Sequence, residues 1–152
     1  MKKMMICALL ATMACTAVGA SDFTSETSSQ QTMVMYSAPS EYTILIPESI
    51  AADGSMHKFE ASKMDLRDNE HVEISATGIE EDGSIHMFTD TGKWAMSKFH
   101  TSNGDYRRGD VISVFDNGMT ESRESFYITA EQSEGAGDYV GTITFNISLV
   151  RG

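Results

Sequence analysis

Short stretches in which apolar residues occupy every second position recur along the chain. The clearest is DYVGTITFNISLV at 138–150, where Tyr139, Ile143, Phe145 and Ile147 alternate with polar or glycine positions. Because side chains of a β-strand point alternately to opposite faces, this segment predicts a strand with one buried face. We expect this strand to lie centrally in its sheet or to span the fold, and so to close the core.

The same period predicts further strands, separated by turns. EYTILIPESI (41–50) places Tyr42, Ile44 and Ile46 on one face before Pro47. Other strands are predicted at 56–62, 70–77, 84–89, 93–99, 110–116 and 124–132. Gly-containing turns such as EDGS and DTGK separate several of them, and no segment after the N-terminal region has a helical period. The pattern predicts an all-β fold, an antiparallel immunoglobulin-like β-sandwich of about 7–9 strands.

Two segments of this pattern echo each other. DGSMHKF (53–59) and DGSIHMF (82–88) both place an Asp-Gly turn before a strand-like run. The echo indicates either duplication of a sheet-building unit or one turn chemistry used twice.

The N-terminus has the pattern of an export signal. Residues 1–20 begin with Lys2 and Lys3, continue with an apolar run, and end in small residues that predict cleavage after Ala20. A lipoprotein cut before Cys15 is the alternative. Residues 21–32, rich in Ser, Thr and Gln, predict a flexible leader, and 33–152 a single β-sandwich domain. We therefore expect a secreted or cell-surface protein.

Cysteine content and net charge further restrict the class of protein. Cys7 and Cys15 both lie in the signal, so the processed chain has no thiol or disulfide, as is common for bacterial exported proteins. Removal of Lys2 and Lys3 takes the net charge from −11 to −13. This acidic chain should repel nucleic acid, and no later apolar run is long enough to span a membrane.

Catalytic and metal-binding patterns are not found in the sequence. There is no G-x-S-x-G motif, and the four histidines are spaced 14 or 15 residues apart, without a zinc-binding pattern. The acidic segments 65–73 and 116–124 indicate either loop calcium sites or solvated turns, without the EF-hand spacing. Trp94 shares a strand face with Met96 and Lys98 and is predicted to lie in the core. We expect a non-enzymatic protein without catalytic, cofactor or metal residues.

One tripeptide suggests a binding loop. Arg108, Gly109 and Asp110 form an RGD sequence in a predicted turn, a pattern found in integrin ligands that also arises by chance. With the loops at 100–110 and 116–123, it supports one alternative function, an extracellular binding module for a host or cell-wall ligand.

Four blocks of the sequence carry a family resemblance. EYTILIPESI, HVEISAT, MFTDTGK and GAGDYVGTITFNISLV, in this order, resemble blocks of small secreted surface proteins of Gram-positive gut bacteria, mostly uncharacterised. The resemblance covers about 42–150 and implies an immunoglobulin-like or pilin-like sandwich with a surface or matrix role. It implies no catalytic residue.

The favoured hypothesis is therefore a structural or adhesive module, a subunit of a fibre or matrix. Such subunits can assemble by strand addition, in which the open sheet edge of one molecule accepts an extended segment from a second copy or from another surface protein. The candidate donor lies in TMVMYSAPS (32–40), with Met33, Val34, Met35 and Tyr36 as its apolar residues. The alternative for this segment is the first edge strand of its own domain.

Overall fold

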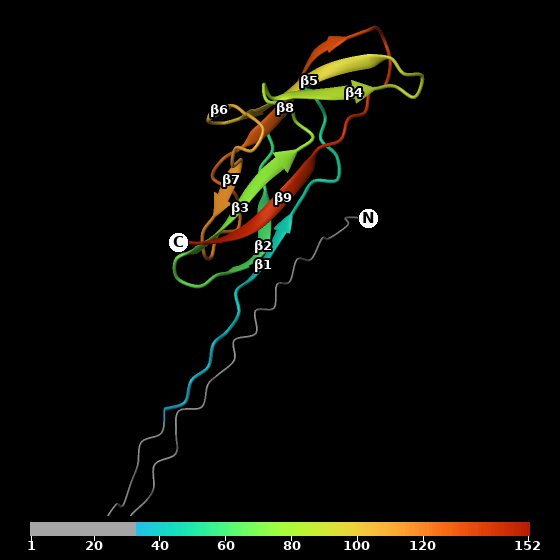
Figure 1. Ribbon diagram of the computed structural model, residues 1–152. Coiled ribbons are helices and arrows are strands. Elements are labelled where there is room, and N and C mark those ends of the chain that lie inside the picture. The colour runs from blue at the N-terminus through green and yellow to red at the C-terminus, as the bar shows by residue number, and fades with distance from the viewer. Residues whose placement is uncertain (1–32) are drawn as a thin grey trace, which may run out of the picture.

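The computed structural model describes residues 33–152, which form nine β-strands and no helix (Figure 1). The strands are β1 (Glu41–Leu45), β2 (Glu60–Asp65), β3 (Glu70–Thr77), β4 (Ser84–Phe88), β5 (Trp94–Thr101), β6 (Gly104–Asp105), β7 (Ser113–Phe115), β8 (Phe126–Ser133) and β9 (Thr144–Arg151). The predicted all-β class is confirmed. The predicted signal (1–20) and leader (21–32) lie outside the described residues.

The strands form three antiparallel groups. β1 pairs with β2; β3 pairs with β7 on one side and β9 on the other; β5 pairs with β4, β6 and β8. The group around β5 lies at one end of an elongated body, and the start of β1 and the C-terminus lie at the other (Figure 1). This arrangement is consistent with the predicted β-sandwich.

Most predicted strands form close to the expected positions. β3 occupies the predicted residues 70–77, and β4, β5 and β8 begin or end within two residues of prediction. The predicted strand at 56–62 is displaced to β2, because His57 makes only an isolated bridge to Phe126 and regular pairing starts at Glu60. The two-residue β6 was not predicted.

The C-terminal strand predicted at 138–150 forms only from Thr144, as β9; its alternation is confirmed there, but its predicted central position is wrong. Along β9 the exposed Thr144, Asn146 and Ser148 alternate with partly buried Phe145 and Ile147. β9 pairs with β3 over all eight of its residues and forms the edge of the β7-β3-β9 sheet. The central position belongs to β3, which pairs with β7 on one side and β9 on the other, and whose inward side chains Val72, Ile74 and Ala76 are buried.

An aromatic cluster joins the sheets in the core. The ring of Phe126 in β8 stacks on Phe59 and Phe99, with centroids 4.7 Å and 5.4 Å away. Phe145 of β9 meets Phe59 edge to face at 5.1 Å. Phe59, Phe99 and Phe126 have no exposed surface. These rings connect β5 and β8 to the chain before β2 and to β9.

The two DGS echoes are turns of the same chemistry. The backbone N–H of Ser55 donates to Asp53 Oδ1 at 2.9 Å, and that of Ser84 donates to Asp82 Oδ1 at 3.0 Å. The glycine between them has a positive φ in both turns, 81° and 86°. The following segments differ, since β4 begins at Ser84 within its turn, whereas β2 begins only at Glu60, five residues after Ser55. The shared Asp-Gly-Ser letters are thus explained by one turn chemistry used twice.

The side chain of Tyr106 hydrogen-bonds to the edge of β3 that β7 leaves unpaired after Ile74. Beyond the short β7, the outward N–H of Ala76 donates to the Tyr106 hydroxyl oxygen at 3.0 Å, and this hydroxyl donates to the Ala76 carbonyl at 3.2 Å. Tyr106 is 1% exposed. One hydroxyl therefore satisfies both main-chain groups of a buried strand residue.

We predict that Tyr106→Phe lowers the free energy of unfolding by about 1–3 kcal/mol, because the buried N–H and C=O of Ala76 lose their partner. Urea denaturation followed by circular dichroism measures the change. Tyr36→Phe removes the same hydroxyl from an exposed side chain and should leave the midpoint unchanged. Equal midpoints for Tyr106→Phe and the unsubstituted protein would contradict this role.

Candidate functional site

The described chain begins with an exposed apolar segment. In residues 33–40, which we call the N-terminal segment, the side chains of Met33, Val34, Met35 and Tyr36 are 83%, 91%, 73% and 89% exposed. The segment forms no strand and leads away from the sheets before β1 (Figure 1). It is not the first edge strand of its own domain. Contiguous exposed apolar side chains of this size are typical of interaction sites.

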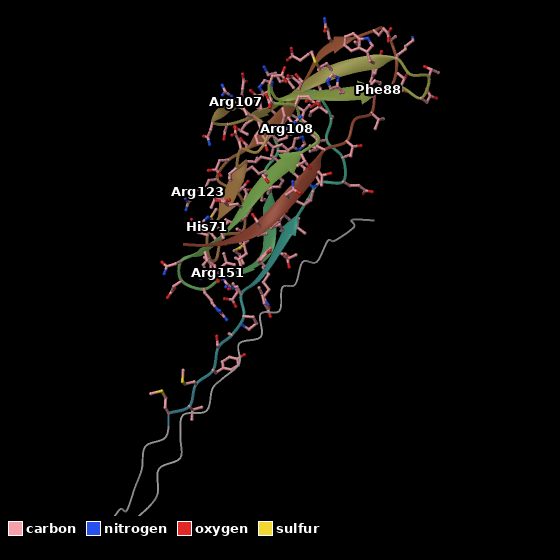
Figure 2. All side chains as sticks on the ribbon, viewed as in Figure 1. His71, Phe88, Arg107, Arg108, Arg123 and Arg151 are labelled. Carbon is pink, nitrogen blue, oxygen red and sulfur yellow. The ribbon has the colours of Figure 1, made fainter. Side chains whose placement is uncertain are left out.

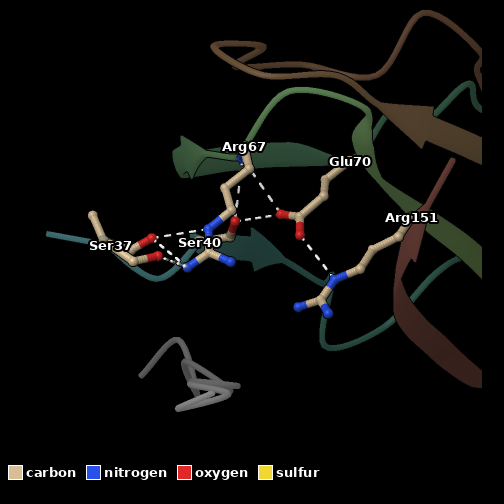
Figure 3. Close-up of polar contacts among 6 residues, drawn as sticks. Ser37, Ser40, Arg67, Glu70 and Arg151 are labelled. Atoms are coloured by element: carbon tan, nitrogen blue, oxygen red, sulfur yellow. Dashed lines mark hydrogen bonds and ion pairs between the residues drawn. The ribbon is translucent and has the colours of Figure 1, made fainter. Parts of the chain in front are cut away.

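A turn between β2 and β3 holds the base of this segment. Asn69 adopts a positive φ of 64°, which closes the turn between Arg67 and Glu70. The Arg67 guanidinium donates from Nε and Nη2 to the carbonyl of Ala38, at 2.9 Å and 2.6 Å, and from Nη2 to Ser37 Oγ at 3.1 Å (Figure 3). The direction in which the segment leaves is thus set by Arg67.

Glu70 extends this contact to both ends of the domain sequence. Its carboxylate accepts a hydrogen bond from the Ser40 hydroxyl and another from Arg151 Nε at 2.9 Å (Figure 3). The Glu70 side chain is only 5% exposed, whereas that of Arg151 is largely exposed. We call the set of Ser37, Ala38, Ser40, Arg67, Glu70 and Arg151 the clip.

The clip changes the ionisation of Glu70. The hydrogen bond from the Ser40 hydroxyl, aided by the Arg67 backbone N–H and by Arg151, holds the pKa of Glu70 below its ordinary value, against the opposing effect of burial. Glu70 is therefore ionised at neutral pH, as its contact with Arg151 requires.

A long groove lies between β1 and β9. Its volume is about 1090 Å³, and its lining comes from β1, residues 46–52, the inner side of β4, and residues 137–147. Consecutive residues of both edge strands line it, Tyr42 to Ile44 and Thr144 to Ile147. Because consecutive strand residues point to opposite faces, a hollow lined by all of them runs along the strand edges.

The RGD sequence forms a turn, as predicted, but both charged side chains are engaged within the chain. Arg108 donates from Nε to the Ile79 carbonyl at 3.0 Å and from Nη2 to Glu80 at 2.7 Å. Asp110 Oδ2 accepts the backbone N–H of Arg107 at 3.0 Å. Gly109 supplies the positive φ of 89°. Figure 2 shows Arg107 and Arg108 apart from the N-terminal segment.

Several carboxylates of the acidic segments are engaged in ion pairs or hydrogen bonds within the chain. Asp116 pairs with Arg123 at 3.1 Å, and Glu121 pairs with Lys58 at 2.6 Å. Within residues 33–152, no group of three or more His, Cys, Asp or Glu side chains is arranged to hold a metal ion. Glu70, in the other acidic segment, is occupied by the clip.

The prediction that Trp94 lies in the core is wrong. Trp94 is 40% exposed, because the face it shares with Met96 and Lys98 is the outer face of the sheet, while Ala95 and the alternate residues after it are buried. Its cross-strand partner Phe88 is 53% exposed and forms a bridge to Val140, which is 73% exposed. We call Phe88, Trp94 and Val140 the tip patch; Figure 2 places Phe88 at the end opposite Arg151.

The clip and the groove were not predicted from the sequence. Arg67 and Ala38 are 29 positions apart, and Arg151 and Glu70 are 81 apart. No local pattern connects such residues, since the turn at Asn69 and the pairing of β3 with β9 bring them together. The one local signal was the apolar run at Met33 to Tyr36, which the sequence did suggest.

Comparison with known proteins gives no relative. No family model, curated protein or solved structure matches the chain. Within the described residues, no helix is of a length and apolarity that would cross a membrane. The N-terminal segment, the clip and the groove are therefore the features of the molecule from which a function is inferred.

We predict that the clip loosens in acid. Because Glu70 has a lowered pKa in the folded protein, its ionised form stabilises the clip above the ordinary glutamate pKa of about 4.3, and this contribution is lost as the pH falls through the lower folded value. The amide NMR signals of Ser37 and Ala38 should shift toward disordered positions over that range.

Glu70→Gln removes the charge with little change in shape. In this variant the same two signals should already be shifted at pH 7 and should no longer titrate with the clip. Glu121→Gln, which removes a surface carboxylate from the ion pair with Lys58, is the matched control and should retain the transition. An unchanged transition in Glu70→Gln would contradict the assignment.

Proposed function

We propose that this protein is a secreted, non-enzymatic structural or adhesive module, built as an immunoglobulin-like sandwich, that assembles into a fibre or matrix by strand addition. The observation that carries the proposal is the exposure of Met33, Val34, Met35 and Tyr36, which lie outside the core of their own domain. The predicted signal at 1–20 and the resemblance to bacterial surface proteins support the extracellular setting.

Burial of this segment on another molecule would be strongly favourable. Each large apolar side chain contributes about 1.5–3 kcal/mol when it is transferred from water into a packed interior. The N-terminal segment also has no charged residue, whereas the whole chain has a net charge of −11. A neutral segment can therefore approach a second acidic copy with less repulsion than other parts of the surface.

The main chain of the segment is suited to the same role. Residues 33–36 form no strand and lie beyond the residues that the clip binds, so an open sheet edge can pair with them. The segment and any acceptor edge are different surfaces of the same protein. Contacts between unlike surfaces join subunits head to tail and produce open filaments where the geometry does not close into a ring.

The alternative function is a loop-mediated binding module for a host or cell-wall ligand, and the tip patch favours it. Phe88 and Val140 border a hollow of about 550 Å³ that Thr89, Asp90 and Lys93 also line. Exposed aromatic and apolar side chains beside polar groups are common in binding sites. The RGD turn supports this alternative less, because Arg108 and Asp110 are engaged within the chain.

Size-exclusion chromatography with light scattering of the secreted protein tests the proposal. We expect concentration-dependent oligomers that become monomers when Met33, Val34, Met35 and Tyr36 are all replaced by serine. Met56→Ser is the matched control, since Met56 is 60% exposed and lies outside the N-terminal segment. This control should assemble normally.

Two outcomes would overturn strand addition through this segment. One is a monomer at every concentration in the unsubstituted protein, and the other is assembly that persists in the four-serine variant. Binding to cell-wall material that survives the four-serine change and is lost in Trp94→Ala with Phe88→Ala would instead support the alternative function.

A further inference from the structure

We infer that the groove between β1 and β9 is the acceptor for the N-terminal segment of a second copy, which pairs with the free edge of β9. This inference rests on the proposed function and adds the acceptor surface, the direction of donation and the part of the segment that inserts.

The hydrophobic core is incomplete along this groove. Ten apolar side chains pack against the buried core but stay partly exposed, and all except Met119 and Leu149 line the groove. Those from β9 and its approach are Ile143, Phe145 and Ile147. A protein interior is normally packed as closely as an organic crystal, so a row of half-covered core residues indicates a site for further side chains.

β9 also has an unused main-chain edge. It pairs with β3 along Thr144–Arg151, and no strand within residues 33–152 pairs with its other side. Edge strands are usually protected by charge, proline or a covering segment. Along the groove, residues 144–147 include no charged residue and no proline, so this part of the edge is open to another strand.

The segment fits this edge in length and character. The part of β9 that lines the groove is Thr144–Ile147, four residues, and the exposed apolar run Met33–Tyr36 also has four. Four extended residues cover about 13 Å in either strand. Alternation directs Met33 and Met35 toward the half-covered side chains in the groove, and Val34 and Tyr36 then share the outer side with Thr144 and Asn146 of β9. Methionine is well suited to fill irregular gaps of this kind.

The clip favours donation to a second copy over insertion into the same domain. Arg67 holds Ser37 and Ala38 at the end of the body where β1 begins, so the preceding residues lead away from their own groove (Figures 1 and 3). To reach that groove, the chain would have to reverse direction at the residues that Arg67 binds. The three hydrogen bonds from Arg67 to Ser37 and Ala38 oppose this reversal.

Disulfide trapping in the full secreted chain tests the acceptor directly, because both native cysteines lie in the predicted signal. Chains with Val34→Cys are mixed with chains with Thr144→Cys or Asn146→Cys and oxidised gently. Paired strands bring Cβ atoms to about 4.5–5.5 Å, close to disulfide geometry. We expect covalent dimers between the two kinds of chain, on at least one of the two β9 positions.

The matched control is Gln132→Cys, an exposed polar position on β8 that lies outside the groove. It should give at least tenfold less dimer with Val34→Cys. A chain that carries both Val34→Cys and Asn146→Cys should form a ladder of covalent oligomers. A monomer with an internal disulfide would overturn donation to a second copy.

A second measurement uses strand alternation. Met33→Ser with Met35→Ser is compared with Val34→Ser with Tyr36→Ser, and the first pair should weaken assembly about tenfold more than the second, because only the first pair inserts. Equal losses would overturn insertion as a strand. Circular dichroism checks that each variant is folded.

The failures of the two proposals are distinguishable. If assembly is absent or does not depend on Met33 to Tyr36, the proposed function fails. If assembly depends on these residues but cross-links form equally well at Gln132, or are absent at both Thr144 and Asn146, only the assignment of the groove fails.

Discussion

The packing around Phe126 is the interaction on which the rest of the structure depends. Its ring stacks on Phe59 and Phe99 and lies 5.7 Å from Phe145. These side chains come from β8, β5, β9 and the chain before β2, so one buried ring connects the paired strands β5 and β8 to β9, which belongs to another sheet. The separate sheet groups become one body through it. Phe145 is the outermost ring of this cluster, since it also borders the groove. The stability of the core therefore depends on the position of β9.

Alternation along the sequence predicted the strands well where one face is buried and the other exposed. β3 was predicted at its observed bounds because Val72, Ile74 and Ala76 alternate with polar residues and turns border the segment. The errors have a common cause. Local alternation identifies two faces of a strand but gives no information on which face is outward or how many neighbours the strand has. Trp94 was therefore assigned to the wrong face, and β9 to the centre of its sheet.

The candidate site likewise has one part that was predicted from the sequence and other parts that were not. The exposed run Met33 to Tyr36 was visible in the sequence as an apolar stretch after a polar leader. The clip was not, because Arg67, Glu70 and Arg151 become neighbours only through the turn at Asn69 and the register of β3 against β9. The groove depends on the same register. The proposed donor segment can be recognised as a local sequence pattern. The proposed acceptor groove exists only once the strands have paired.

The pairing of β3 with β9 has a consequence for biogenesis. Glu70 is matched with Arg151, and Thr77 with Thr144, so this ladder spans most of the domain sequence. Contacts of such long range form slowly, because a large loop must close before they contribute. A chain that emerges N-terminus first cannot complete its β7-β3-β9 sheet until residues 144–151 have also emerged. Completion of this sheet, and with it the packing of Phe145 against Phe59, is therefore one of the last steps of folding and follows synthesis of the whole domain.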